Sequence, residues 1–228
     1  MRLAAFRLTV LLALACPAAA AAEGGVDLSA NVGVVSDYRF RGLSLSDRNP
    51  ALQGGVDLEA GMGLFAGTWA STIADYGGAN VELDVYGGYA GSLAGIDYRL
   101  SANAYFYPGG RDVDYVEFRL EAEREFGPVT LGAEAAFVPH QRNIGTANHY
   151  FGASASVAIP GLSGLAANAR AGREQGFYDN KWDWELGLAY TRGALTASLA
   201  YVDSNHGGMN EEGRLGRAGL VASLLASF

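Results

Sequence analysis

Apolar and polar residues alternate with a period of two along most of the chain. In the stretch 96–106, Ile96 and every second residue after it form an almost wholly apolar set, and the residues between them, beginning with Asp97 and Arg99, are polar. A β-strand places two such sets on opposite faces, whereas an α-helix would scatter both around its circumference. The alternation therefore predicts an all-β chain.

Twelve segments carry this pattern, and each runs ten to fourteen residues. They are residues 28–41, 51–60, 63–73, 80–91, 95–107, 113–126, 129–139, 149–159, 164–174, 181–192, 194–203 and 216–228. Strands of soluble proteins usually have about five or six residues, whereas about ten tilted residues are needed to cross a bilayer. The segment lengths therefore predict membrane-spanning strands.

The connections between these segments alternate in length. Short turns at residues 61–62, 92–94, 127–128, 160–163 and 193 are interleaved with longer polar connections at 42–50, 74–79, 108–112, 140–148, 175–180 and 204–215. This arrangement is typical of a transmembrane antiparallel β-barrel of about 12 strands, with short periplasmic turns and longer extracellular loops. An exported β-sandwich or lipocalin-like barrel would share the alternation, but the strand lengths and the charges on nearly every second face argue against it.

Residues 1–22 have the anatomy of a cleaved signal peptide for export through the Sec pathway. Arg2 and Arg7 supply a positive start, Leu8–Ala15 is an apolar core, and Ala18–Ala22 offers cleavage sites before Glu23. The apolar core is too short for a span of about 20 residues. We therefore expect residues 23–228 to form a single outer-membrane β-barrel domain.

Composition narrows the class of protein further. The only cysteine, Cys16, lies in the leader, so the mature chain has no disulfides. The formal charge is −8, and no basic stripe is present, so nucleic acid is not an expected partner. Mean hydropathy is +0.08, as expected where lipid-facing apolar residues and lumen-facing charges average out.

If the apolar set faces lipid, the polar set lines a lumen. The candidate pore-lining residues are Asp37, Arg39, Arg41, Asp57, Glu59, Glu82, Asp84, Asp97, Arg99, Glu117, Arg119, Glu134, Arg170, Asp183 and Glu185. Ten of these are acidic and five are basic, so an open lumen should mildly prefer cations.

The same charges could instead pair with one another and serve the structure alone. Arg99 could bridge to Glu82 or Asp84, and Arg119 to Glu134. The run Asp37-x-Arg39-x-Arg41 would lie on the inner face of the first strand. There it could form a constriction or a solute clamp, or tie that strand to Asp57 and Glu59.

Aromatic residues near the strand ends are expected to form the two girdles at the membrane interfaces. The candidates are Tyr38, Phe40, Trp69, Phe106, Trp182, Trp184, Tyr190 and Phe228. A sugar-stacking track inside the pore is the alternative use of aromatic residues, for which the inward residues Tyr86, Tyr105, Tyr107 and Tyr115 are better candidates.

Several sequence blocks resemble the TorF family of porins, formerly grouped as conserved hypothetical proteobacterial proteins. They are Ser36–Ser44 (SDYRFRGLS), Pro50–Gly55, Leu64–Ser71, Val81–Tyr89 and, near the end, Asp183–Asp203. The resemblance spans essentially the whole mature chain, with Leu45 as a departure where a polar residue is usual. It implies an outer-membrane barrel with pore activity, and no particular substrate.

An enzyme is the least favoured class. Outer-membrane phospholipases place serine and histidine side by side, but here His140, His149 and His206 fall in or next to loops, with no serine motif and no metal-ligand spacing. We therefore expect no catalytic residue, metal or cofactor. The predicted function is passive diffusion of small solutes or ions, and the alternative is a non-conducting structural or adhesive barrel.

The expected partners follow from this reading. They are outer-membrane lipids, the transported small solutes or ions, and the barrel-assembly machinery, which would recognise the C-terminal strand ending in Phe228.

Overall fold

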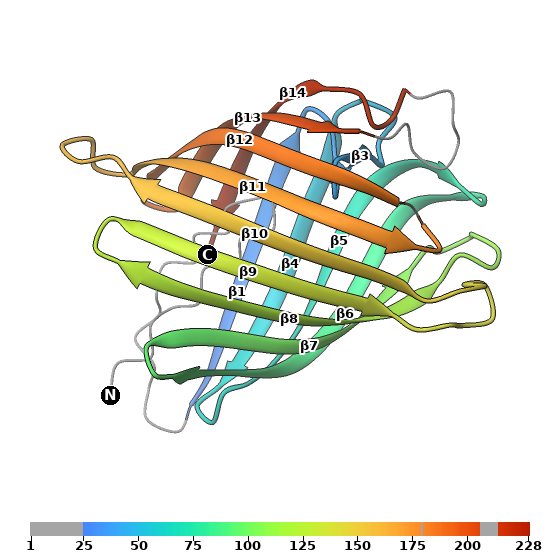
Figure 1. Ribbon diagram of the computed structural model, residues 1–228, viewed down its shortest axis with the longest axis horizontal. Coiled ribbons are helices and arrows are strands. Elements are labelled where there is room, and N and C mark those ends of the chain that lie inside the picture. The colour runs from blue at the N-terminus through green and yellow to red at the C-terminus, as the bar shows by residue number, and fades with distance from the viewer. Residues whose placement is uncertain (1–24, 179, 206–213) are drawn as a thin grey trace.

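Twelve antiparallel strands close into one barrel in the computed structural model (Figure 1), which describes residues 25–178, 180–205 and 214–228. The strands are β1 Val26–Val35, β4 Ala51–Ala60, β5 Leu64–Tyr76, β6 Ala79–Leu93, β7 Ile96–Phe106, β8 Tyr115–Phe126, β9 Val129–Val138, β10 Asn148–Ala158, β11 Leu165–Gly176, β12 Asn180–Arg192, β13 Leu195–Ser204 and β14 Gly219–Ser227. The predicted fold class is confirmed. The proposed signal peptide, 1–22, lies outside the described residues.

Neighbouring strands are also neighbours in sequence, except where the barrel closes. There β1 pairs with β14, from Asn31 opposite Ser227 to Val35 opposite Ser223, and on its other side with β4 over its whole length. Closure gives every barrel strand a neighbour on both sides, so the sheet has no open edge. The described residues contain no helix long and apolar enough to cross a membrane.

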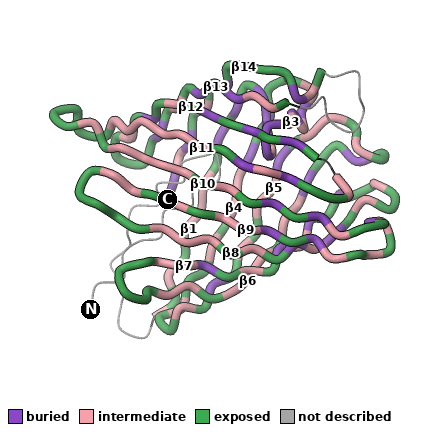
Figure 2. The backbone as a smooth tube through the Cα atoms, viewed as in Figure 1, coloured by how far each residue is buried: buried purple, intermediate pink, exposed green. Residues whose placement is uncertain are grey.

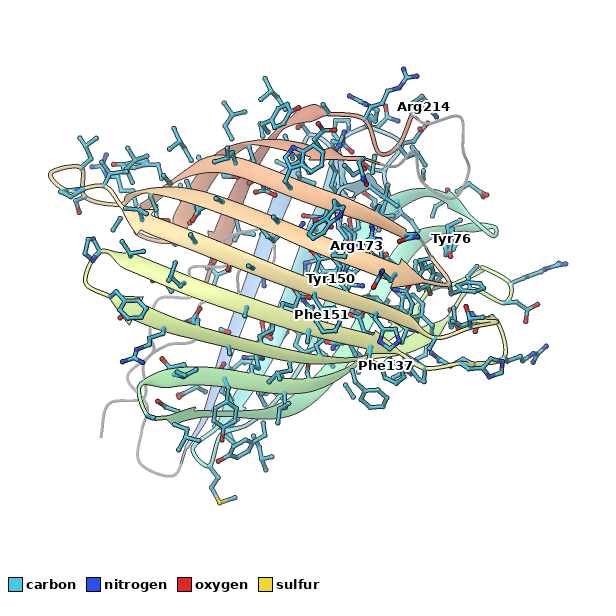
Figure 3. The ribbon with its side chains drawn as sticks, in the orientation of Figure 1. Tyr76, Phe137, Tyr150, Phe151, Arg173 and Arg214 are labelled. Carbon is cyan, nitrogen blue, oxygen red and sulfur yellow. The ribbon has the colours of Figure 1, made fainter. Side chains whose placement is uncertain are left out.

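The two faces of the wall are the reverse of those in a water-soluble domain. In β12 the outward residues Trp182, Trp184 and Leu186 are 52%, 37% and 64% exposed, whereas the charged residues Lys181 and Asp183 are buried on the inside. Most of the other strands repeat this alternation, with large apolar side chains outside and polar side chains inside. Figure 3 shows the side chains along the wall, where Phe137 and Phe151 are exposed and Tyr150 is fully buried.

The first strand ends earlier than the alternation predicts. β1 stops at Val35, and residues 36–50 turn into the barrel, where they form a short hairpin of β2 (Arg39–Phe40) and β3 (Leu43–Ser44). The expectation of one strand over 28–41 is therefore wrong at its C-terminal end. Most buried positions lie in the half of the barrel around this hairpin (Figure 2).

The connections follow the predicted alternation in part. At the long-loop end, the connections over residues 36–50, 107–114, 139–147 and 205–218 are long, as predicted. The connection between β5 and β6 is only Gly77–Gly78, both with positive φ, because the two strands extend beyond the predicted 74–79 loop. β11 likewise extends to Gly176 and β12 begins at Asn180, so the connection between them is shorter than the predicted 175–180 loop.

Candidate functional site

The hairpin of residues 36–50 has a two-residue turn at its tip. Arg41 and Gly42 connect β2 to β3 with φ angles of 47° and 83°, the signs required by a type I′ turn. A Cβ atom on Gly42 would lie 2.8 Å from Cβ of Asp183 on β12 and 3.0 Å from Cβ of Ser204 on β13. Only glycine therefore allows the tip to lie so close to the opposite wall.

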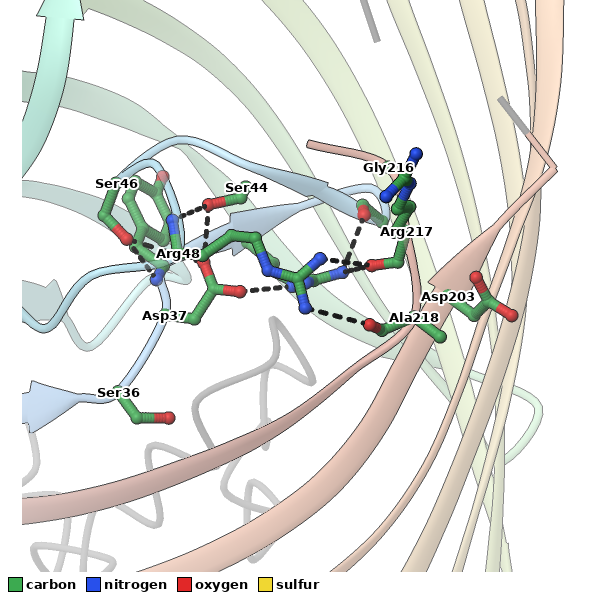
Figure 4. A network of polar contacts seen from close by, with 12 residues as sticks. Ser36, Asp37, Ser44, Ser46, Arg48, Asp203, Gly216, Arg217 and Ala218 are labelled. Atoms are coloured by element: carbon green, nitrogen blue, oxygen red, sulfur yellow. Dashed lines mark hydrogen bonds and ion pairs between the residues drawn. The ribbon is translucent and has the colours of Figure 1, made fainter. Parts of the chain in front are cut away.

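Asp37 holds the base of the hairpin together (Figure 4). Its carboxylate accepts hydrogen bonds from Arg39 Nε at 2.7 Å and from Ser44 Oγ at 2.5 Å. Arg39 Nη1 also donates to the backbone oxygen of Arg217 at 2.7 Å, and Arg48 Nη2 donates to that of Ala218 at 3.0 Å. These bonds fix the hairpin to the segment that leads into β14.

Arg41 extends from the tip of the hairpin across the lumen to three carboxylates. Its Nη1 atom lies 2.8 Å from Glu117 on β8 and 3.4 Å from Glu174 on β11, and its Nη2 atom lies 3.7 Å from Glu134 on β9. The guanidinium carbon also lies 4.2 Å from the ring centre of Tyr150. Burial lowers the pKa of Arg41, but the three carboxylates outweigh it and raise this pKa well above its ordinary value.

Further ion pairs line the wall around this cluster. Arg119 Nη2 lies 2.8 Å from Glu134, which confirms the predicted bridge, and 3.2 Å from Glu121. Arg170 Nη2 lies 3.0 Å from Asp183, and Lys181 forms an ion pair with Glu174. We name these residues and Arg41, Glu117 and Tyr150 the lumen network.

Two predicted pairings are wrong. Arg99 bridges to Glu59 on β4, 3.6 Å away, and its guanidinium carbon lies 3.3 Å from the ring centre of Phe65. It forms no ion pair with Glu82 or Asp84. The charged run of residues 37–41 does not reach Asp57 or Glu59, because it belongs to the inward hairpin and not to the first strand.

Several inward carboxylates lack a cationic partner. Within the described part of the chain, Glu82, Asp84 and Glu185 form no ion pair, although Tyr38 Oη donates to Glu82 Oε1 at 2.7 Å. Asp57, which accepts a hydrogen bond of 2.5 Å from Tyr86, and Asp97 lie inside the barrel nearer the short turns, where side chains are less buried.

The aromatic candidates fall into two groups. Phe106, Trp182, Trp184, Tyr190 and Phe228 are exposed on the described structure, at 40%, 52%, 37%, 46% and 70%. Tyr38, Phe40 and Trp69 lie inside, which corrects the expectation that they form an interface girdle. The rings of Tyr38 and Trp69 are 5.4 Å apart, and Phe40 lies 6.2 Å from Tyr105.

The physical reasons for this correction differ. Tyr38 and Phe40 leave the wall with the hairpin, so strand parity does not apply to them. In β5 the residues on the opposite parity to Trp69 are Leu64, Ala66, Thr68 and Ala70, so both faces of this strand are weakly apolar and the alternation is ambiguous.

Four members of the lumen network are not among the candidate pore-lining residues, namely Glu121, Tyr150, Glu174 and Lys181. Tyr150 is fully buried and its ring lies against Gly172, where a Cβ atom would be 1.9 Å from Tyr150 Oη. Lys181, also fully buried, shares the parity of Asp183 and Glu185 and is the chain's only lysine, a signal that could have identified it. The described residues contain no group of three side chains suited to hold a metal ion.

Sequence comparison identifies the family. Residues 19–228 match the profile of a family described as "Bacterial protein of unknown function (Gcw_chp)". The chain belongs to this family. No curated protein matches the sequence.

Solved porin structures share the fold. The KdgM porin superposes with a TM-score of 0.61 at 7% identity, covering 88% of this chain and 99% of KdgM. The NanC porin superposes with a TM-score of 0.56 at 14% identity, covering 89% of this chain and 99% of NanC. A further KdgM structure, in complex with disordered oligogalacturonate, has a TM-score of 0.60 at 6% identity and covers 88% of this chain and 98% of that one.

Proposed function

We propose that the mature chain is an outer-membrane pore through which small solutes or ions diffuse passively. The observation that carries this proposal is the inverted wall, in which exposed leucine, valine and aromatic side chains surround a lumen of buried charges. Such a surface suits lipid, and the ionic interior suits a water-filled path. Within its family we assign the chain to the TorF porins.

This location implies a route and an assembly partner. We propose Sec-dependent export with removal of residues 1–22, followed by insertion by the barrel-assembly machinery. That machinery would recognise β14 and the terminal Phe228, whose backbone nitrogen donates to the oxygen of Ala30 at 2.8 Å. The lumen network is assigned no covalent chemistry.

The proposed pore mildly prefers cations. Each basic side chain that we place in the described lumen already pairs with a carboxylate, namely Arg39, Arg41, Arg99, Arg119, Arg170 and Lys181. Glu82, Asp84 and Glu185 remain without ion pairs and set the sign of the field that a mobile ion meets. An acidic oligosaccharide such as the one in the KdgM complex would be repelled by this lumen.

Planar-bilayer recording of the refolded mature protein tests the proposal. Under a KCl gradient we expect discrete channel events and a reversal potential whose sign shows K⁺ passing more easily than Cl⁻. Well-folded protein that gives no events would favour a non-conducting structural barrel. Channels that prefer Cl⁻ would refute the assigned selectivity while leaving the pore itself in place.

A further inference from the structure

A cavity of about 420 Å³ lies between the hairpin and the wall at the long-loop end. Leu43 and Leu45 of the hairpin form one side, and the ends of β5, β7 and β8 form the other. Its volume is within the usual range for small-molecule sites. Asp75 and Arg214, which line it, are exposed, so the cavity reaches the protein surface there.

Aromatic rings cover much of the cavity wall. Tyr105 and Tyr115 are stacked with their ring centres 4.5 Å apart, and Tyr178 lies 5.3 Å from Tyr115. Tyr76 and Tyr107 form an edge-to-face pair at 4.9 Å. These lining tyrosines come from four separate parts of the chain.

The charges of the cavity are unbalanced. Glu174 is neutralised by Arg41 and Lys181, and Asp47 is neutralised by Arg214. Glu82, only 2% exposed, also lines the cavity and forms no ion pair with a described residue. A buried carboxylate without a cationic partner is unfavourable, and a bound cation would remove that cost.

We propose that this cavity binds a small organic cation that carries an ammonium group with apolar substituents. The ammonium charge would lie against Glu82, and the tyrosine faces would contact the substituents through their negative ring quadrupole. A neutral sugar could stack on the same rings, but it would leave the Glu82 charge without a partner. This proposal rests on the proposed function in one respect: the bound cation is a transported solute only if the barrel is a pore.

Calorimetry of the refolded protein in detergent micelles tests binding without requiring conductance. The probe is benzyltrimethylammonium, compared with neutral benzyl alcohol, glucose and galacturonate at the same concentrations. We expect the cation alone to bind, and Glu82→Gln to weaken its binding on the order of tenfold, which corresponds to about 1.4 kcal/mol. Glutamine retains the oxygen that accepts the Tyr38 hydrogen bond.

A matched control removes a carboxylate from the same end of the barrel without touching the cavity. Asp112→Asn fits this purpose because the Asp112 side chain is 69% exposed and does not line the cavity. We expect it to bind the cation as the wild type does. A second variant, Tyr76→Leu, should also weaken binding, which separates the ring contribution from the charge. Circular dichroism checks that each variant forms the folded barrel.

Several results would overturn the assignment. They are no binding of the cation, equal binding of benzyl alcohol, preferential binding of glucose or galacturonate, and unchanged affinity in folded Glu82→Gln. Bilayer recordings on the same preparation keep this test separate from the proposed function. Cation-preferring channels without binding would refute only the cavity site, and binding without channels would refute only the pore.

Discussion

Replacing Arg41 by glutamine tests whether the lumen network holds the hairpin inside the barrel. The variant removes the only charge at the hairpin tip and leaves Glu117, Glu134 and Glu174 facing it. Glu134 retains Arg119 at 2.8 Å and Glu174 retains Lys181. Glu117, whose side chain is 1% exposed, retains the hydrogen bond from Tyr105 Oη at 3.3 Å, and its one remaining cationic partner among the described residues is Arg119, with Nε 3.7 Å away.

The free energy lost on Arg41→Gln follows from which carboxylates keep a cationic partner. Removing one member of a buried ion pair costs about 3–5 kcal/mol because a charge remains buried without compensation. Two of the three carboxylates keep close partners, so we expect about 3 kcal/mol, the lower end of that range. This corresponds to a loss of roughly 100-fold in the equilibrium constant for docking of the hairpin.

Two assays report the released hairpin. Single-channel conductance should rise, and cation preference should increase because Glu117 then faces the open path without a close cationic partner. Trypsin should cleave after Arg39, which is only 8% exposed in the docked hairpin. Arg142→Gln is the matched control, because it removes the same charge at the same end of the barrel. The Arg142 side chain is 91% exposed and pairs with exposed Asp112.

The reasoning is refuted by a folded Arg41→Gln protein that conducts like the wild type and keeps Arg39 protected from trypsin. In that case the hydrogen bonds of Asp37 and the apolar contacts of the hairpin would suffice to hold it. An equal rise in conductance for Arg142→Gln would point to general surface electrostatics. Exposed pairs of this kind contribute only about 0–1 kcal/mol, so we expect no such rise.

Two further substitutions probe the hairpin and the wall. Asp37→Asn weakens the charge-assisted bond from Arg39 Nε at 2.7 Å, and a loss of about 1.5–3 kcal/mol should raise hydrogen exchange over residues 36–50. Asp47→Asn, at a partly exposed pair, should leave exchange unchanged, and equal effects would contradict the special role of Asp37. Gly172→Ala places a methyl group 1.9 Å from Tyr150 Oη and should lower barrel stability to urea by about 1–3 kcal/mol. Gly145→Ala, whose added methyl group meets nothing closer than 3.7 Å, should leave the stability of the barrel unchanged. A Gly172→Ala barrel as stable as the wild type would mean that Tyr150 moves aside freely.

The barrel wall could be predicted from sequence because one physical constraint acts on every strand. A one-residue slip would turn Lys181, Asp183 and Glu185 towards the outside and Trp182 and Trp184 towards the lumen, so the pattern fixes which face each residue takes. Where the constraint is weak, the prediction fails. Trp69 lies in a strand whose two faces are both weakly apolar, and inside the barrel its ring packs against that of Tyr38.

The hairpin could not be predicted, because its residues continue the alternation of the first strand. Residues 36–41 alternate in sequence as a strand would, but their side chains contact strands far along the chain, as Tyr38 does with Glu82 and Arg41 with Glu117. No local pattern records such a contact. Arg41 and Gly42 make the hairpin turn with positive φ angles, but an Arg-Gly pair is a weaker hairpin signal than Asn-Gly.

This failure changes what the inward charges mean. The alternation assigns acids and bases to the inner face of the barrel but treats each as equally available to a passing ion. The structure divides them: Arg41 and Glu117 neutralise each other, whereas Glu82 and Asp84 form no close ion pair with a described residue. Because a neutralised pair contributes little field beyond its own length, selectivity should follow the unpaired carboxylates and not the total count. A porin-like barrel with a different set of pairs could therefore carry the same net charge and prefer ions of the opposite sign.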